Sequence, residues 1–453
     1  MTNNDTICAL ATATGGALAV IRISGPQSLS ITSSICSLNV ESVEANTTHF
    51  ARLTNPFGEL IDEVMVSVFH APRSYTGEDS VEFSCHGSSY IITKVLEVLI
   101  ANGCRMANPG EYTMRAYLNR KMDLSQAEAV ADLIASTNKA THHIAMSQLR
   151  GHFSSELSSL RGHLLKLTSL LELELDFSDH EDLEFADRNE LLELAQRIEN
   201  HISHLVQTFE MGQALKNGIP VAIIGKTNVG KSTLLNKLLK DERAIVSDIH
   251  GTTRDTIEDT IDINGVTFRF IDTAGIRQTA DTVEQIGIER TYQAMDKARI
   301  ILWLIDEEPS KEEIQVMQEK CEGKSLIIIQ NKIDKEEIIP TSTLSSLTTH
   351  FVTISAKFGT NIDQLEKEIY TVANIPEIKE NDIIVTNARH YNALLRAQED
   401  IQRVISGLEQ NLSGDLLSED LRMILSTLAE ITGGEITPNE VLGNIFKHFC
   451  VGK

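Results

Sequence analysis

Several features are scarce in this chain of 453 residues, and each scarcity excludes a class of protein. Its six cysteines are scattered without a CxxC pair, which argues against a zinc site or a disulfide framework and for a reducing compartment. No apolar run approaches the roughly 20 residues that span a bilayer. Residues 1–6 are polar and unlike a secretory signal peptide. We therefore expect a cytoplasmic protein without a membrane span.

Basic residues are also scarce, because Lys and Arg total 40 against 64 Asp and Glu, for a formal net charge of −24. This balance opposes nucleic-acid binding by the surface as a whole, so any RNA partner must meet a local basic patch. A hydrophobic share of 42% and a charged share of 23% are ordinary for a globular protein. The length predicts about three domains of roughly 150 residues each.

The chain does contain a phosphate-binding loop. Residues 225–232 read GKTNVGKS, follow the apolar run 219–224 and precede a helix-like segment. Glycines let backbone N–H groups surround phosphates, Lys231 supplies positive charge, and the Ser232 hydroxyl can ligate Mg²⁺. The residues of this loop predicted to contact the nucleotide are Asn228, Val229, Gly230, Lys231, Ser232 and Thr233.

Three further motifs follow apolar strands, in the order found in a guanine-nucleotide switch. The sequence DTAG at 272–275 places a carboxylate near the metal and a glycine near the γ-phosphate. In NKID at 331–334, the Asp334 carboxylate can accept both N–H donors of the guanine edge, a pair that adenine lacks. SAK at 355–357 supports the base. The predicted contacts are Asp272, Thr273, Ala274, Gly275, Asn331, Lys332, Asp334, Ser355, Ala356 and Lys357.

The segment between the phosphate loop and DTAG completes a Ras-like order of elements. Thr253, in GTTRD at 251–255, is predicted to reach Mg²⁺ only when the γ-phosphate is present. Residues 260–268 alternate apolar and polar side chains around Asn264-Gly265, which predicts a β-hairpin.

The residue after DTAG departs from the Ras pattern. Ras-type enzymes place a water-positioning glutamine there, but this chain has Ile276, whose side chain can neither donate nor accept a hydrogen bond. Another group must therefore position the attacking water. The following segment offers several candidates, most of which also suit the solvated face of a helix, and the sequence does not choose among them. They are Arg277, Asp281, Glu284, Glu289 and Arg290.

The regions on either side of the GTPase motifs differ from the GTPase region in their pattern of apolar residues. Strand-like segments and a helix over 89–101 predict an α+β domain at residues 1–120. Apolar residues at helical spacing then predict a helical bundle whose two parts, 121–216 and 377–453, flank an inserted Ras-like α/β GTPase domain at 217–376. The apolar series includes Leu157, Leu160, Leu164, Leu167 and Leu171.

Several motifs together resemble one family. They are VIRISGP at 20–26, SYTGED at 74–79, PGEYT at 109–113, LNRKMDL at 118–124, the GTPase set and the terminal CVGK at 450–453. On these residues, and along essentially its full length, the chain resembles the MnmE (TrmE) family, bacterial GTPases of tRNA wobble-uridine modification. Other GTPases share only the central part.

The resemblance implies an amino-terminal fold similar to tetrahydrofolate-binding one-carbon enzymes. It also implies a homodimer with a site for 5-formyl- or 5,10-methylene-tetrahydrofolate between the subunits. A carboxylate suits the donor edge of a pterin, and basic side chains suit the glutamate tail. The residues that match the family's folate contacts are Arg22, Glu78, Lys121 and Lys453. Cys450 matches a functional tail cysteine whose role stays open, and the loop at 12–17 is shorter than in the family.

For hydrolysis, the resemblance implies that K⁺ replaces an arginine finger and offsets the developing negative charge. The residues that match its K⁺ ligands are Asn228, Ser247, Ile249 and Thr252, within a nucleotide-contacting loop of Ser247, Asp248, Ile249, His250, Gly251, Thr252 and Thr253. Glu284 matches the water-positioning glutamate, and Arg277 matches a supporting arginine. Asn228 could instead merely stabilise the turn of its loop.

The resemblance further implies an FAD-dependent partner, MnmG. With it, aminomethyl or carboxymethylaminomethyl groups are added to carbon 5 of the tRNA wobble uridine. Two alternatives are a ribosome-assembly GTPase and a dimeric scaffold with residual GTPase. An assembly factor should carry a basic RNA-binding appendage, whereas this chain is acidic. The scaffold hypothesis is disfavoured because the phosphate, metal and base positions are all filled.

Overall fold

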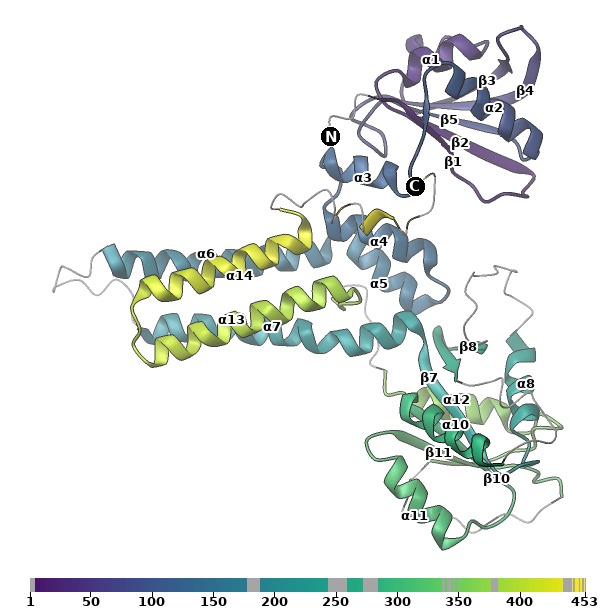
Figure 1. The fold of residues 1–453 in the computed structure, drawn as a ribbon, viewed down its shortest axis with the longest axis vertical. Helices are drawn as coiled ribbons and strands as arrows, with labels where there is room; N and C mark the ends of the chain where they lie inside the picture. Colours follow the sequence, from purple (N-terminus) through teal and green to yellow (C-terminus); the bar gives the residue numbers. More distant parts are fainter. Residues whose placement is uncertain are drawn as a thin grey trace. The chain divides into compact units, whose positions relative to one another are not determined.

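The computed structural model describes residues 5–176, 188–242, 259–271, 284–335, 350–375 and 382–434, with residues 339, 344, 347, 348, 442, 445–447, 449 and 452. The described side chains exclude those of 173–176, 240–242 and 284–290. The chain divides into two compact units (Figure 1). Unit 1 comprises Met1–Ile134, Gln148–Glu199 and Arg396–Lys453, and unit 2 comprises Ala135–Ser147 and Asn200–Leu395.

Unit 1 begins with a six-stranded sheet of order β3-β4-β5-β2-β1-β6. Its strands are β1 (Ile7–Leu10), β2 (Leu18–Ser24), β3 (Thr47–Thr54), β4 (Leu60–Phe69), β5 (Ser80–His86) and β6 (Arg105–Met106). Strand neighbours are antiparallel except β1 and β6. Alternate residues such as Ile21, Ile23 and Phe83 are buried in one core with residues of α1 (Ser28–Ile35) and α2 (Ser89–Ala101). The structure confirms the predicted helix over 89–101.

The other face of this sheet carries exposed apolar side chains. Strand register aligns Phe50 with Met65, Met65 with Ser84, and Ser84 with Val20, so these four residues form a row across four strands. Phe50 is 60% exposed and Met65 is 43% exposed. The neighbouring row contains Ser67, Glu82 and Arg22. We call this surface the open face. It lies opposite the face that α1 and α2 cover, because side chains alternate along each strand.

Long helices form the rest of unit 1. They include α3 (Glu111–Leu118), α4 (Leu124–Ala135), α6 (His152–Asp176) and α14 (Gly414–Thr432). The helix α6 packs along α14, and the predicted leucine series on α6 is buried (Figure 1). A 3₁₀ turn, η1 (Val40–Ser42), links α1 to β3. The helices α7 (Arg188–Asn217) and α13 (Ala388–Glu409) each contribute residues to both units.

Unit 2 is built on a second six-stranded sheet, of order β12-β11-β10-β7-β9-β8. Its strands are β7 (Ile219–Gly225), β8 (Asp259–Ile263), β9 (Val266–Phe270), β10 (Ile300–Ile305), β11 (Ser325–Gln330) and β12 (Phe351–Thr353). All neighbours are parallel except β8 and β9, which form the predicted hairpin around Asn264-Gly265.

Helices cover both faces of this parallel sheet, as is usual for α/β domains. Along β7, Val221 and Ile223 join a core with α8 (Lys231–Glu242) and α12 (Ile362–Val372). The intervening Ala222 and Ile224 join a second core with α10 (Glu284–Lys297) and α11 (Lys311–Lys320). A near-continuous apolar strand is therefore buried on both sides.

The chain enters and leaves the GTPase region beside α7. The Val385 N–H donates to Thr208 Oγ1 at 3.0 Å, and the Gln213 side chain donates to the Thr386 carbonyl at 2.6 Å. The Phe209 and Tyr391 rings stack with centroids 3.9 Å apart. A domain inserted into another domain has its first and last residues close together. Here the segment that precedes β7 and the segment that follows α12 lie side by side. The individual domain boundaries stay predictions.

The β8–β9 hairpin also contacts the start of α5 (Lys139–Leu149), in the part of that helix that belongs to unit 2. The Ala140 N–H donates to the Gly265 carbonyl at 3.1 Å, and Asn138 Nδ2 donates to Thr267 Oγ1 at 2.7 Å. The Asn138 Oδ1 atom accepts the Thr141 N–H at 2.8 Å, which caps the start of α5. The amino-terminal end of α5 is thus fixed to the hairpin that lies between GTTRD and DTAG.

We expect Gly265→Ala to weaken this contact. The backbone at Gly265 has φ +80°, and an added Cβ would lie 2.9 Å from Lys139 Cβ. The left-handed conformation costs a side chain about 1–2 kcal/mol, and overpacking adds roughly 1–3 kcal/mol. Hydrogen exchange of β8 and β9 in the full-length protein measures the loss.

Gly323→Ala is the matched control, because Gly323 has φ +74° and no atom within 4 Å of its added Cβ. It should show the conformational cost alone in its own turn. Equal losses at the two glycines would show that the contact with α5 contributes nothing to the hairpin.

Candidate functional site

The predicted phosphate loop connects β7 to α8. At Gly225 (φ +148°) an added Cβ would lie 2.4 Å from the Leu304 carbonyl oxygen of β10, so only glycine fits. The loop continues through left-handed backbone at Asn228 (φ +62°) and Gly230 (φ +107°). The carbonyls of Gly225 and Lys226 accept hydrogen bonds from Lys231 Nζ at 2.6 and 2.7 Å. Burial lowers the pKa of Lys231 from its ordinary value.

This loop fits a phosphate group. Its amide-rich curve ends at the start of α8, where helix N–H groups lack intrahelical partners and the helix dipole favours an anion. The predicted residues Lys231, Ser232 and Thr233 form the first turn of that helix. A negatively charged ligand would offset the burial that disfavours the Lys231 ammonium.

The Asn331 side chain joins the base-recognition motif to the phosphate loop. Its Nδ2 donates to the Val229 carbonyl at 2.8 Å, and its Oδ1 accepts the Ala356 N–H at 2.9 Å. Asn331 is buried, and an added Cβ at Gly230 would lie 2.3 Å from its Nδ2. A single amide therefore fixes three segments that follow β7, β11 and β12.

Asp334 is held in an ionised, oriented form. The Ser355 hydroxyl donates to Asp334 Oδ1 at 2.7 Å, and this hydrogen bond lowers the pKa of Asp334 from its ordinary value. An ionised carboxylate can accept both N–H donors of guanine. The Lys357 ammonium lies over the Phe358 ring, 5.3 Å from its centroid. The structure thus brings Asp334 and Ser355 together, as a guanine site requires.

The motifs did not identify the acidic residues that follow β10. Lys332 Nζ lies 2.6 Å from Asp306 Oδ2, and Lys332 itself has φ +66°. Lys226 pairs with Glu307 at 2.8 Å and with Glu313 at 3.3 Å. The place of Asp306 and Glu307 directly after a buried strand of a parallel sheet is a signal that could have found them, whereas Glu313 lies within α11.

Several predicted residues lie outside the described part of the chain. They are Ser247, Asp248, Ile249, His250, Gly251, Thr252, Thr253, Asp272, Thr273, Ala274, Gly275, Arg277, Cys450 and Lys453. Glu284 begins α10, of which the structure describes only the backbone at that position. Roles assigned to these residues stay predictions.

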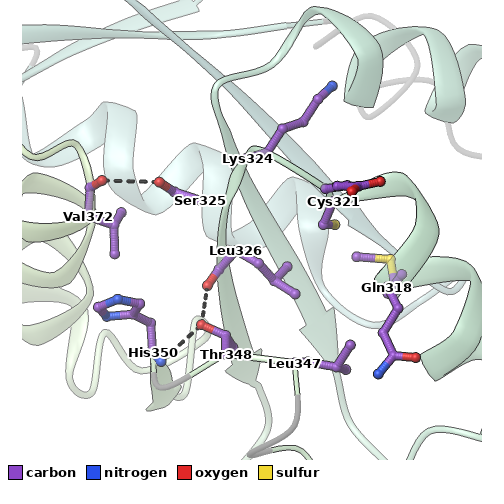
Figure 2. A pocket seen from close by; sticks show the side chains of 11 residues that line it. Gln318, Cys321, Lys324, Ser325, Leu326, Leu347, Thr348, His350 and Val372 are labelled. Atoms are coloured by element: carbon purple, nitrogen blue, oxygen red, sulfur yellow. Dashed lines mark hydrogen bonds between the residues drawn. The ribbon is translucent and has the colours of Figure 1, made fainter.

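A cavity of about 610 Å³ in unit 2 is a different feature from the nucleotide site (Figure 2). Its lining includes Ser325 at the start of β11, Val372 at the end of α12, and His350 before β12. The phosphate loop follows the carboxyl end of β7, which runs parallel to β10 and β11. The cavity therefore lies at the amino ends of the strands, whereas α/β domains bind ligands at the carboxyl ends.

Unit 1 gathers three of the predicted folate residues around one loop. Arg22, on the open face, contacts Tyr75 of the loop between β4 and β5, with its guanidinium 5.3 Å from the ring centroid. Lys121 donates to the Pro72 carbonyl at 2.9 Å, and its Cγ lies 3.3 Å from the position of a Cβ added at Gly77. Glu78 follows in the same loop. These side chains come from β2, the loop, and the segment after α3.

Arg22 is oriented from several sides. Its Nε donates to Glu82 Oε1 at 2.7 Å, and its guanidinium lies 5.5 Å from the centroid of Tyr112, whose hydroxyl donates to the Arg22 carbonyl. The Gly452 carbonyl accepts a hydrogen bond from Arg22 Nη1 at 3.5 Å. The sequence did not predict Tyr75 and Tyr112 as site residues, although they lie within the motifs SYTGED and PGEYT. A basic group flanked by aromatic rings suits a planar, anionic ligand.

The penultimate residue packs against β1 of the same chain. Gly452 is buried with φ +93°, and an added Cβ would lie 2.2 Å from the Leu10 carbonyl oxygen. Nearby, an added Cβ at Gly110 would lie 2.9 Å from Phe449 Cβ, so the preceding segment also contacts the start of α3 closely. Gly452 therefore lies beside Arg22 of the same chain.

Two family models match the chain. One, described as GTP-binding protein TrmE N-terminus, matches residues 6–121, and the other, described as MnmE helical domain, matches residues 124–450. Together with the two sheets and the helical region, they confirm the predicted fold class. Among the described residues, no helix combines the length and the apolar character needed to cross a bilayer.

Curated relatives match along the whole chain. A Bacteroides thetaiotaomicron protein named tRNA modification GTPase MnmE is 56% identical, with 100% of both chains covered. Proteins of the same name from Phocaeicola vulgatus and Flavobacterium johnsoniae are 54% and 50% identical, also with 100% of both chains covered. Identity at this level over full length leaves no part of the chain outside the match. The chain therefore belongs to the MnmE family of tRNA modification GTPases.

Proposed function

We propose that this chain is a GTP hydrolase that drives modification of carbon 5 of the tRNA wobble uridine. Full-length family membership carries the proposal. The hydrogen bonds of Asn331 to the phosphate loop and to Ala356 support it, because they assemble a guanine-nucleotide site. The group added is aminomethyl or carboxymethylaminomethyl, and MnmG, an FAD-dependent protein, is the partner. The reaction takes place in the cytoplasm.

Bound GTP would carry Mg²⁺ into this site. Ser232, in the first turn of α8, and Thr253 are the proposed ligands, and the ion would neutralise charge on the phosphate oxygens. The chain's own part in hydrolysis is to bind and orient the nucleotide through Lys231, Asn331 and Asp334. Glu284 is the proposed group that holds the attacking water, and Arg277 supports it.

A potassium ion is the proposed substitute for an arginine finger. Asn228 supports this, because its backbone is left-handed (φ +62°), a conformation that glycine adopts more easily. The loop nevertheless carries an amide side chain there, and an amide oxygen can ligate a cation. The remaining proposed ligands are Ser247, Ile249 and Thr252. Hard cations prefer oxygen ligands, which an amide, a hydroxyl and backbone carbonyls provide.

A tetrahydrofolate derivative is the proposed source of the one-carbon unit. Arg22 and Lys121 contact the loop that bears Glu78, and the Gly452 carbonyl accepts a hydrogen bond from Arg22. Cys450 and Lys453 are neighbours of Gly452 in the sequence and complete the proposed set. The open face supports a homodimer, because its row of Phe50, Met65 and Val20 leaves apolar area that a second copy would cover. Arg22 lies on that face, so a site there would adjoin the second subunit.

Deletion of the gene should abolish C5 aminomethyl and carboxymethylaminomethyl groups at the tRNA wobble position. Mass spectrometry of wobble nucleosides measures them. The wild-type gene should restore them, whereas Lys231→Ala should not, because the phosphate loop loses its ammonium. An unaltered nucleoside profile in the deletion strain would favour the ribosome-assembly alternative.

GTP turnover should be at least about tenfold faster in K⁺ than in Na⁺, since a fitted cation offsets charge that develops in the transition state. Asn228→Gly should abolish the difference, because glycine retains the left-handed backbone and removes only the amide. Asn264→Gly, at φ +54° in the hairpin turn, is the matched control and should keep the K⁺ response. Equal wild-type rates in the two salts would remove the ion proposal.

Glu284→Ala should lower GTP turnover by roughly 100-fold or more while nucleotide affinity changes little, because the proposed role exists only in the transition state. Single-turnover hydrolysis and equilibrium binding separate the two quantities. Asp296→Ala, which removes an exposed carboxylate from the same helix α10, is the control and should hydrolyse GTP normally. Unchanged turnover in Glu284→Ala would assign the water to another group of that segment.

A further inference from the structure

Arg115 is a fully buried cation that no motif singled out. Its side chain has 0% exposure, yet three carboxylates surround it. Nη2 donates to Asp5 Oδ1 at 2.7 Å and to Glu111 Oε1 at 3.0 Å. Nη1 donates to the Asp5 carbonyl at 2.9 Å and lies 3.2 Å from both oxygens of Glu78. Within the described residues, its Nε has no hydrogen-bond partner.

Glu78 is held from two sides. While Arg115 contacts both carboxylate oxygens, the Ser24 hydroxyl donates to Oε2 at 2.8 Å and also contacts Thr76 Oγ1 at 2.7 Å. Glu78 keeps 14% of its side chain exposed, whereas Arg115 keeps none. Arg115 therefore lies behind Glu78, and a ligand that arrives from solvent meets the carboxylate first. A carboxylate has about four lone-pair sites, so these contacts leave acceptor capacity.

The rest of the cluster fixes Arg115 itself. Arg105 contacts both Glu111 oxygens, at 3.0 and 2.6 Å, and its Nε donates to Asp5 Oδ2 at 2.7 Å. Burial opposes ionisation of Glu111, but hydrogen bonds from Arg105, the Asn108 N–H and Arg115 outweigh it and lower the pKa of Glu111. The cluster thus contains two cations and three anions, of which only Glu78 belongs to the predicted ligand site.

Stability alone does not account for this arrangement. Buried ion clusters contribute little net stability, because desolvation of the charges offsets their attraction, and an unpaired Nε adds a further cost. A requirement for a Glu78 carboxylate of fixed orientation accounts for both the burial and the location. Such a carboxylate recognises adjacent N–H donors on a planar ring in two-point geometry.

We propose that Arg115 is a positioning residue that fixes the Glu78 carboxylate to read the 2-amino and N3–H donor edge of a pterin. This inference rests on the proposed folate site and names the group that sets its specificity. Arg115 acts through Glu78 and does not touch the ligand. Its loss frees the carboxylate to rotate, so a ligand with both donors of this edge loses its advantage over one that lacks the 2-amino donor.

The test measures affinity of the full-length protein for two ligands, 5-formyltetrahydrofolate and its analogue in which methyl replaces the 2-amino group. Arg115→Met should lower affinity for the first by roughly 10–100-fold and for the analogue by roughly threefold or less, since the analogue keeps N3–H but lacks the second donor that two-point recognition by Glu78 requires. Arg115→Lys, which keeps the charge, should recover part of the discrimination. Arg105→Met is the matched control, because the Arg105 guanidinium bonds to Asp5, Glu111 and the Met106 carbonyl on the side of the cluster away from Glu78, and it should discriminate like the wild-type protein.

Each outcome decides a separate point. Wild-type protein that binds neither ligand overturns the proposed folate site, and this inference with it. Wild-type protein that discriminates, beside a folded Arg115→Met variant that loses affinity equally for both ligands, overturns the positioning role alone and leaves the folate site standing. If Arg115→Met does not fold, Arg115→Lys decides, and wild-type discrimination in that variant rejects the proposal.

Discussion

The nucleotide site depends on one buried amide. Asn331 donates to the phosphate loop and accepts from Ala356, so loops after three parallel strands are held in a single geometry. A buried amide is costly unless its donor and acceptor are both paired, and here each has a partner. The phosphate and base halves of the site are thereby coupled, because neither loop can move without breaking a buried hydrogen bond. Asp334, the residue predicted to read the base, is oriented by the Ser355 hydroxyl.

The same unit links nucleotide chemistry to the helical region. The hairpin β8–β9 is fixed to the start of α5 by the Asn138 and Ala140 contacts, and α7 is fixed to the returning chain by Thr208 and Gln213. Both attachments consist of buried or half-buried hydrogen bonds beside close glycine contacts, at Gly265 and Gly212. A rearrangement of the segments that flank the hairpin would therefore act directly on α5.

The amino-terminal domain uses charge differently. Its sheet buries one face in aliphatic side chains and leaves the other with an apolar row beside the Arg22–Glu82 pair. Behind Glu78 lies the Arg115 cluster, where hydrogen bonds from the exposed Arg105 and the buried Arg115 help to lower the pKa of Glu111. Gly452 packs against β1, at a position where only glycine fits. Rigid support beneath a few exposed polar groups is the usual design of a selective small-molecule site.

The sequence by itself determined the local elements and the chemistry of the motifs. Alternation around Asn264-Gly265 predicted the hairpin, the helix over 89–101 was predicted with its observed bounds, and glycines in GKTNVGKS marked the phosphate loop. These predictions succeed because periodicity, turn residues and strand-end motifs act over a few residues. The Ras-like order of elements and the family motifs extended them to the fold class.

Tertiary structure alone decided which distant groups meet. Three hydrogen-bonded pairs illustrate this. Arg22 and Gly452 are 430 positions apart in the sequence, Arg115 and Glu78 are 37 positions apart, and Lys332 and Asp306 are 26 positions apart. Composition and spacing do not predict such pairs, because a charged side chain bonds only to groups within about 3 Å, and the fold decides which groups those are. The sequence thus specified what each segment is, and packing determined which side chains act together.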